Sequence, residues 1–364
     1  MRSFFTAVIL CFAFNLAQGS TIPVAPTRSC AGDMAAIQSA INSAQPRDVV
    51  QLAAGTYDFS CLTADNPIFV RNTDIAIQGS PDGSVLVGPP VGTESFTPAF
   101  FVASDGVTFD TLQFENFFPA IQAGSGGRQI SRFAITNSQF RNNPQSIRVA
   151  QNTASVQMVG NTFVIPAPTS TDITSDFGES FGVTIGRNCS NLLFSKNTLT
   201  GPGVAVHFQT TDQVIADPRA SGEGLRTIGL LQADFSGEVA ELGRVSDNKV
   251  SGLDLGMQAS SNMGVITHNN VTGNAIGITL SNDFDDGVHQ VTQNVITENV
   301  ASGNEVGIWI ASGSNNTITL NDVRDDSLAG VLFLANPGGA PSTGNFFHQN
   351  QGGKIVGAKG NTGF

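Results

Sequence analysis

Short apolar runs alternate with polar turn residues along almost the whole chain, and they return at a nearly regular interval. Eight asparagines occur in one local pattern, in which an apolar, a polar and a variable residue precede Asn-x-apolar; they are Asn137, Asn161, Asn197, Asn248, Asn269, Asn299, Asn321 and Asn345. By subtraction, four of the seven intervals are 21 to 24 residues, which is the length of one turn of a coiled β architecture. The intervals of 30, 36 and 51 indicate the same turn with inserted loops.

A second pattern supports the repeat. An apolar–x–apolar triplet follows most of these asparagines, and its flanking residues should point inward while its middle residue points outward, because side chains alternate across a strand. The outward residues of the triplets are Arg148, Thr184, His207, Gln258, Thr279, Trp309 and Leu332. The chain from about Ile68 onward has this strand and turn chemistry throughout, which predicts stacked short strands.

The segment before these repeats predicts a cap. Asp33 precedes Ile37, Ala40 and Ile41, which share one helical face. Asp33 is therefore the expected N-cap of a short amphipathic helix. Such a helix would cover the open end of the stack, which a repeat protein has to shield from water.

Two stretches match motifs of a known fold. One is residues 36–57, which end in Val-Val-Gln-Leu-Ala-Ala-Gly-Thr-Tyr, and the other is the pair of Gly-Asn-rich turns at 273–278 and 303–308. In these stretches the chain resembles right-handed parallel β-helix proteins of the pectin-lyase-like superfamily. The resemblance covers roughly residues 30–350 and implies an all-β, single-stranded right-handed parallel β-helix (a solenoid) with a short N-terminal capping helix. Members usually bind polysaccharide on the face of the long strand.

No specific enzyme family of this superfamily is matched. The Gly-His-Gly and Arg-Ile-Lys signatures of polygalacturonases do not occur in the sequence, and Asp217-Pro218-Arg219 is the nearest counterpart of the Asp-Pro-His core of mannuronan epimerases. The candidate sites below are therefore inferred from stacking, since this scaffold carries many activities.

The N-terminal residues predict export. Arg2, an apolar run from Phe4 to Ala17 and the small residues at its end make residues 1–19 typical of a secretory signal peptide. We expect a secreted protein, extracellular or periplasmic, with no membrane association after removal of the leader. Export favours a disulfide between Cys30 and Cys61, and the alternative is that the cysteines remain buried thiols.

The rest of the chain reads as one structural unit. We divide it into an N-terminal cap with the first strands (20–66) and a parallel β-helix (67–364), with inserted loops near 166–179, 209–241 and 282–290. The net charge of −12, with only 17 Lys and Arg residues, disfavours nucleic acid as a partner. It also favours a soluble monomer.

The residues just before the asparagines form a column that could carry chemistry. From Asn161 onward this column reads Gly160, Lys196, Asp247, His268, Glu298 and Leu320. Neighbouring strands lie about 4.8 Å apart, so Asp247 and Glu298 would flank His268 and orient it as a general acid or base. The alternative is an exposed ladder of alternating charges, which contributes little.

The outward residues of the triplets form a second column, predicted to bind substrate. Arg148 could neutralise a uronate carboxylate, His207 could transfer a proton, and Trp309 could offer its ring to a sugar. The predicted substrate-binding residues are Arg148, Thr184, Gln258, Thr279 and Trp309. The alternative is that these outward residues are simply solvated, with Trp309 half-covered by the loop at 282–290.

One inserted loop is rich in carboxylates. Asp283, Asp285 and Asp286 lie within four residues of each other. They could hold Ca²⁺, a candidate cofactor, through oxygen ligands, or supply the acid pair of a glycosidase. A polar turn without ligand is the other interpretation.

Two functions follow, and the sequence does not decide whether the protein is an enzyme. The first is an exported protein that acts on or binds an acidic, uronate-containing polysaccharide, by lyase or C5-epimerase chemistry rather than hydrolysis. His207 or His268 would be the base, and Asp247 or Glu298 would orient it. The second is a non-catalytic surface, adhesion or glycan-binding β-helix protein.

Overall fold

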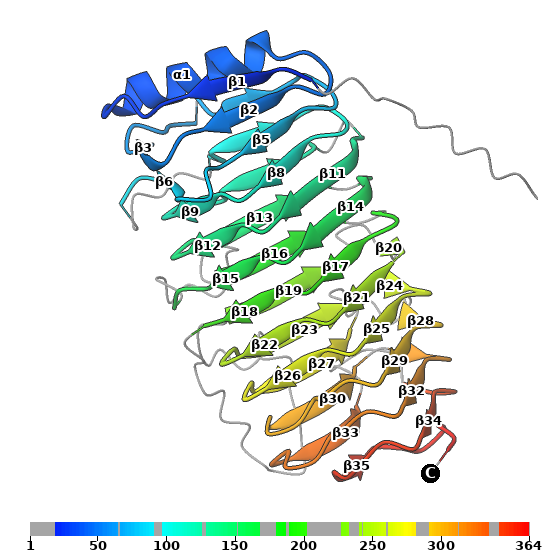
Figure 1. Ribbon diagram of the computed structural model, residues 1–364. Coiled ribbons are helices and arrows are strands. Elements are labelled where there is room, and N and C mark those ends of the chain that lie inside the picture. Colours follow the sequence, from blue (N-terminus) through cyan, green and yellow to red (C-terminus); the bar gives the residue numbers. More distant parts are fainter. Residues whose placement is uncertain are drawn as a thin grey trace, which may run out of the picture.

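The computed structural model describes residues 19–64, 66–90, 97–125, 129–150, 152–167, 180–186, 189–201, 227–232, 240–241, 243–259, 261–281, 291–311, 313–334 and 342–363. The chain winds as a single-stranded, right-handed parallel β-helix, as predicted (Figure 1). Each complete turn adds one short strand to each of three parallel sheets, which we name A, B and C in the order in which the chain visits them. We call one such turn a rung.

The strands of each sheet are short and follow one another in chain order. Sheet A contains β1 (Thr21–Val24), β2 (Val49–Leu52), β5 (Ala76–Gln78), β8 (Thr108–Asp110), β11 (Ser131–Thr136), β14 (Ala154–Val159), β17 (Leu193–Ser195), β21 (Arg244–Ser246), β25 (Val265–Thr267), β29 (Val295–Thr297), β32 (Thr317–Thr319) and β34 (Phe346–His348). Sheet B contains β3 (Gly55–Asp58), β6 (Ser84–Val87), β9 (Gln113–Glu115), β12 (Gln139–Arg141), β15 (Thr162–Val164), β18 (Thr198–Thr200), β22 (Lys249–Ser251) and β26 (Asn270–Thr272). Sheet C contains β4 (Ile68–Val70), β7 (Phe100–Val102), β10 (Ile121–Ala123), β13 (Gln145–Val149), β16 (Ser180–Ile185), β19 (Thr227–Gln232), β23 (Leu255–Ala259), β27 (Ile276–Leu280), β30 (Val306–Ile310), β33 (Ala329–Phe333) and β35 (Ile355–Val356). Two further pairs join β20 (Ala240–Glu241) to β24 (Ser261–Asn262) and β28 (Val291–Thr292) to β31 (Gly313–Ser314).

The core lies inside the coil and is built from the inward residues of all three sheets. Because alternate residues of a strand point to opposite faces, each rung supplies a few apolar side chains and depends on its neighbours to bury them. In the N-terminal half, Phe114, Phe140 and Phe163 of sheet B stack face to face, with ring centroids 5.0 and 4.9 Å apart. Stacked aromatic pairs of this kind add to the area that they bury.

The helix α1 (Cys30–Ser43) covers the N-terminal end of the coil, as predicted (Figure 1). Its buried Ile37 and Ile41 face the first rungs. The N-cap is Ser29 rather than the expected Asp33, because the Ser29 hydroxyl accepts the backbone N–H of Gly32. Asp33 is buried instead, where its carboxylate accepts the backbone N–H of Asp58 at 2.7 Å.

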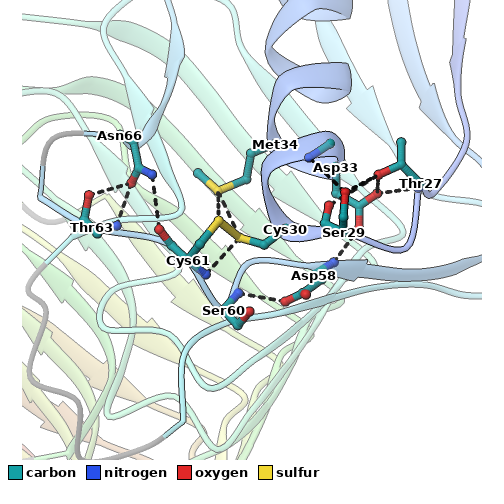
Figure 2. The surroundings of a disulfide bond; sticks show 11 residues. Thr27, Ser29, Cys30, Asp33, Met34, Asp58, Ser60, Cys61, Thr63 and Asn66 are labelled. Atoms are coloured by element: carbon teal, nitrogen blue, oxygen red, sulfur yellow. Dashed lines mark hydrogen bonds between the residues drawn. A yellow bond between two sulfur atoms is a disulfide. The ribbon is translucent and has the colours of Figure 1, made fainter.

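The predicted disulfide is confirmed. Cys30 at the start of α1 is bonded to Cys61, which follows β3, so the bond ties the cap to the first rung. Figure 2 shows the thioether of Met34 beside this bond, 3.7 Å from the Cys30 sulfur. Cys189 is a free, buried cysteine, and burial raises the pKa of its thiol to about 11.

The repeated asparagines form a ladder at the turn from sheet A to sheet B. The backbone N–H and the side-chain amide of each asparagine both donate to the side-chain oxygen of the next, as in Asn269 to Asn299 at 3.0 and 2.9 Å. The members are Asn161, Asn197, Asn248, Asn269, Asn299, Asn321 and Asn350. Each of these asparagines is buried or nearly so, and the hydrogen bonds of the ladder satisfy its amide inside the coil.

Two of the eight predicted asparagines lie elsewhere. Asn137 is exposed and adopts φ 50°, and the neighbouring Ser138 takes the ladder position. Asn345 belongs to a second ladder at the turn into sheet A, with Asn294, Asn316 and Asn361. A third, shorter ladder at the turn into sheet C joins Asn274 to Asn304 and ends at Asp326.

Candidate functional site

The column of ionisable residues before the ladder asparagines lies in register, as the spacing predicted. Lys196, Asp247, His268 and Glu298 occupy the same place in successive rungs, at the turn from sheet A to sheet B. Their φ angles are 58°, 60°, 55° and 57°. This left-handed conformation is what the tight turn before each ladder asparagine requires.

His268 contacts Glu298 directly. Its Nε2 lies 2.8 Å from a Glu298 carboxylate oxygen, and its Nδ1 lies 2.8 Å from the hydroxyl of Thr267. The two side chains are 52% and 48% exposed, so water screens their interaction and the pair adds little stability. The two contacts hold the imidazole in one orientation, which an acid–base role would need as well.

The outward residues of sheet C form the second predicted column, with one change. Arg148, Thr184, Gln258, Thr279, Trp309 and Leu332 are register partners along the sheet. Leu231 of β19 stands between Thr184 and Gln258, where His207 was expected. This assignment was wrong because the triplet of the strand itself, Leu230-Leu231-Gln232, ends in a polar residue, so the apolar–x–apolar pattern selected Val206-His207-Phe208 instead. His207 lies outside the described residues.

The C-terminal half of this face is covered. Gln258, Thr279 and Trp309 are 5%, 1% and 4% exposed, and the Trp309 indole N–H donates to the carbonyl of Leu334 at 2.9 Å. Trp309 belongs to an apolar cluster outside the main core, which we call the covered cluster: Phe181, Leu255, Ile276, Val306, Trp309, Ala311, Ala329 and Leu332. The indole ring therefore packs within the protein. It does not offer its face to a sugar ring, as was expected from the sequence.

The N-terminal half of the same face is open. Its outward residues, which we call the open strip, are Phe69, Phe101, Gln122, Arg148 and Thr184, one from each of five neighbouring strands of sheet C. Arg148 is exposed and the other four are partly exposed. Within the described residues the Arg148 guanidinium has no ion-pair partner.

The aromatic end of the open strip is held firmly. The rings of Phe69 and Phe101 meet edge to face with centroids 5.8 Å apart, and the guanidinium of Arg71 lies 4.3 Å from the centroid of Phe69. Strand β4 is the edge of sheet C, and Gln38 of α1 completes its pairing: the Gln38 amide donates to the Phe69 carbonyl and accepts the Phe69 N–H, at 3.0 and 2.8 Å. The cap thus positions the first aromatic ring of the strip.

Sequence reasoning missed Phe69, Phe101 and Gln122, although a signal for them exists. Each is the middle residue of an apolar–x–apolar triplet, in the segments 68–70, 100–102 and 121–123. These rungs carry no ladder asparagine from which the position of a triplet could be counted. The triplet pattern alone would have extended the column to the cap.

The two columns do not form one centre. Arg148 lies in the middle of sheet C, whereas His268 lies at the turn between sheets A and B. Asp283, Asp285 and Asp286 fall outside the described residues. In the described part, no group of three or more His, Cys, Asp or Glu side chains gathers as a metal site, and none of the helices is long and apolar enough to cross a membrane.

The chain is similar to known proteins of the same architecture. A family model described as "Periplasmic copper-binding protein (NosD)" matches residues 187–362. Similar solved structures include the Dettilon tailspike protein, at 13% identity over 93% of this chain and 68% of that one, with a TM-score of 0.48. A mannuronan C-5 epimerase A-module from Azotobacter vinelandii has 13% identity over 91% and 95% of the two chains, with a TM-score of 0.47.

A pectate lyase is a further similar structure, at 14% identity over 96% of this chain and 79% of that one, with a TM-score of 0.45. No curated protein matches the sequence. Identities this low do not carry an activity from those proteins to this chain.

Proposed function

We propose that this right-handed parallel β-helix, which has the fold of the pectin-lyase-like superfamily, is an exported protein that binds a carboxylate-bearing polysaccharide along the open strip. The observation that carries the proposal is the alignment, on one axial column, of two partly exposed phenylalanine rings with an exposed arginine that has no ion-pair partner among the described residues. The disulfide between Cys30 and Cys61 supports an oxidising, extracytoplasmic compartment.

The chemistry of the open strip suits a sugar polymer. Phe69 and Phe101 offer apolar faces that can cover the carbon-bound hydrogens of a pyranose ring. Gln122 and Thr184 add hydrogen-bonding groups, and Arg148 can bind a carboxylate through two parallel hydrogen bonds. The strip runs along the coil axis, with one side chain about every 4.8 Å, so an extended chain would meet a new contact at each rung.

Because of the net charge of the protein, a polyanion can be attracted only by a local part of its surface. At −12 the protein as a whole repels a polyanion. An acidic polymer must therefore gain its affinity from Arg148 and the neighbouring aromatic surface. The combination of an exposed arginine and partly exposed aromatic rings distinguishes the open strip, as a binding surface, from the rest of this acidic molecule.

Catalysis by lyase or C5-epimerase chemistry is the second candidate, and the His268–Glu298 contact favours it. Both reactions start with abstraction of the proton next to a uronate carboxylate and need a base together with a cation. Lys249, one rung before His268 on sheet B, and Lys196, two rungs before it in the same column, are exposed cations on that side of the coil. Binding ranks first because Arg148 lies on a different sheet from this base.

Metals do not enter the proposal. Calcium was a candidate only for Asp283, Asp285 and Asp286. Copper appears in the description of the matched family, but the soft and nitrogen ligands that copper prefers do not meet in threes among the described residues. We therefore assign no step to either ion.

Binding to immobilised pectate, alginate and glycosaminoglycans tests the proposal. Arg148→Gln should weaken binding about tenfold, because a charge-assisted hydrogen bond to a carboxylate is lost. Arg141→Gln is the matched control, since Arg141 is also exposed but lies on sheet B. Equal loss in both variants, or no binding to any of these polymers, would remove the support for the open strip.

The same polymers, followed by ultraviolet absorbance of unsaturated uronate, test the catalytic candidate. A lyase would release absorbing product, and replacing His207 and His268 together should abolish it while the fold is retained. Tight binding without product would identify the protein as a binder.

A further inference from the structure

We infer that the ligand of the open strip is a sparsely charged polysaccharide, in which carboxylate-bearing sugars are separated by neutral ones, and not a homopolymer of uronates. This inference rests on the proposed function and narrows its ligand class. The observation behind it is the position of the cations along the strip rather than their mere presence.

Among the described residues, cations lie along the strip at two separated places. Arg71, two residues after Phe69 on the same face of the chain, lays its guanidinium over the Phe69 ring, and Arg148 lies on β13. Strands β4 and β13 are separated by β7 and β10 in sheet C. Three rung steps therefore separate the two cations, which corresponds to roughly 14 Å.

In the described part of sheet C, the outward residues of the two strands between these cations are uncharged. Phe101 and Gln122 are the outward residues there, and Thr184 follows Arg148 on the other side. A pyranose residue of an extended chain is about as long as one rung is tall. An acidic sugar at each cation would therefore leave its intervening neighbours over Phe101 and Gln122.

This spacing penalises a homopolyuronate. A carboxylate placed against the Phe101 ring would lose water without gaining a cation or a hydrogen-bond donor, which costs free energy. The Gln122 amide could donate to one carboxylate, but it compensates no charge. A neutral sugar at both positions keeps the apolar contact with Phe101 and avoids this cost. The strip therefore selects polysaccharides by the positions where they lack charge as well as by the positions where they carry it.

Oligosaccharides of equal length and different carboxylate density test the inference with the intact protein. The probes are a neutral glucan, gellan fragments, whose glucuronates are separated by several neutral sugars, hyaluronan fragments, whose glucuronates alternate with neutral sugars, and polygalacturonate, in which every sugar is acidic. We expect gellan fragments, which can place one glucuronate at Arg148 and neutral sugars over Gln122 and Phe101, to bind about tenfold more tightly than polygalacturonate and than the neutral glucan. Arg71→Gln combined with Arg148→Gln should reduce the gellan affinity to that of the neutral glucan.

The outcomes separate this inference from the proposed function. If polygalacturonate binds most tightly and Phe101→Ala or Arg148→Gln abolishes that binding, the open strip is the site but the inference is wrong. If the double arginine variant weakens all four probes by the same factor, the cations do not select and the inference is also wrong. If none of the probes binds, or if the strip variants bind as the parent does, the proposed function fails and the inference falls with it.

Discussion

The two halves of sheet C share one inner face and differ in their outer face. Inward residues such as Ile147 in β13 and Ile308 in β30 are equally buried and pack in the same core. Outward, Arg148 is exposed, whereas Trp309 is 4% exposed within the covered cluster. Inward positions therefore determine that the coil forms, and outward positions determine what each stretch of its surface can do.

The turns of the two halves differ in the same sense. In the C-terminal half, an amide ladder runs at each of the three turns of the rung. Asn299, Asn316 and Asn304 each belong to one of these ladders. In the N-terminal half, a stack of phenylalanines in sheet B supports the rungs, and Ser138 begins the ladder. Buried amide networks fix the backbone in one arrangement when all their groups are satisfied. The more heavily laddered half carries the covered cluster, and the other half carries the open strip.

The largest expected effect comes from breaking the ladder. Asn299→Ala removes the acceptor for both N–H groups of Asn269 and the donor to the Ile266 carbonyl, all of them buried. Each buried polar group left without a partner costs about 1–3 kcal/mol, so we expect a loss of about 4 kcal/mol or more in the free energy of unfolding. Urea denaturation followed by circular dichroism measures it.

Ser138→Ala is the matched change in the N-terminal half. It removes the hydroxyl that accepts the Leu112 N–H but keeps the backbone contact to Asn161, so we expect a loss of about 1–2 kcal/mol. Equal losses in the free energy of unfolding for the two variants would show that the ladder stabilises both halves equally.

The ladder also illustrates how much of the fold the sequence contains. The repeat of Asn-x-apolar predicts the parallel coil and the stacking of Asp247, His268 and Glu298, because both depend on a local pattern that recurs in register. The capping helix is predicted separately, from the apolar face that Ile37, Ala40 and Ile41 share. Asn137 and Asn345 were misassigned because asparagine suits left-handed turns and ladders alike, and a single sequence does not separate the two uses.

The candidate site was predicted less well than the fold, for physical reasons. Whether an outward residue is exposed depends on what the inserted loops and neighbouring strands place over it, and periodicity holds no information about that. Trp309 was therefore expected at the surface and lies buried, while Phe101 was overlooked and lies partly exposed. The column containing Arg148 was predicted, because strand alternation alone fixes it.

The outer face itself can be tested by removing one large side chain from each half. Trp309→Ala deletes an indole that is buried in the covered cluster and hydrogen-bonded to Leu334, and we expect a loss of about 3–5 kcal/mol in the free energy of unfolding. Phe101→Ala removes a partly exposed ring and should cost only about 1 kcal/mol, while it weakens polysaccharide binding. A smaller loss for Trp309→Ala than for Phe101→Ala would mean that the covered face contributes no more packing than the open one.

A pH-dependent effect concerns the end of the third ladder, beneath the covered half. Asp326 stands where the ladder would continue with an amide, and its Oδ1 accepts the Asn304 N–H at 2.8 Å. Its Oδ2 is buried and has no hydrogen-bond partner among the described residues. The pKa of Asp326 is raised to about 7, chiefly by burial and with a smaller contribution from the negative charges of Asp322 and Asp325, against the lowering by the Asn304 hydrogen bonds.

The sign of the pH dependence follows from that shift. The unfolded chain releases this proton near the ordinary aspartate pKa of about 4, whereas the folded chain holds it up to about pH 7. Between these values the folded state binds more protons, so the stability that this group contributes falls as the pH rises and levels off above pH 7. We expect the melting temperature of the parent protein to be lower at pH 8 than at pH 5 through this group.

Asp326→Asn should remove this dependence and raise the melting temperature at pH 8. Asn274 and Asn304 donate their side-chain amides to the carbonyls of Val250 and Val271, and an amide at position 326 can donate in the same way to the next carbonyl of that row, on Ala301. A protonated carboxyl can make the same contact and a carboxylate cannot, which is why the substitution should matter at pH 8 and hardly at pH 5. Asp325→Asn, at the exposed neighbouring position, should leave the difference between the two pH values in place. If both variants shift the melting temperature equally at both pH values, the effect comes from net charge rather than from the buried end of the ladder.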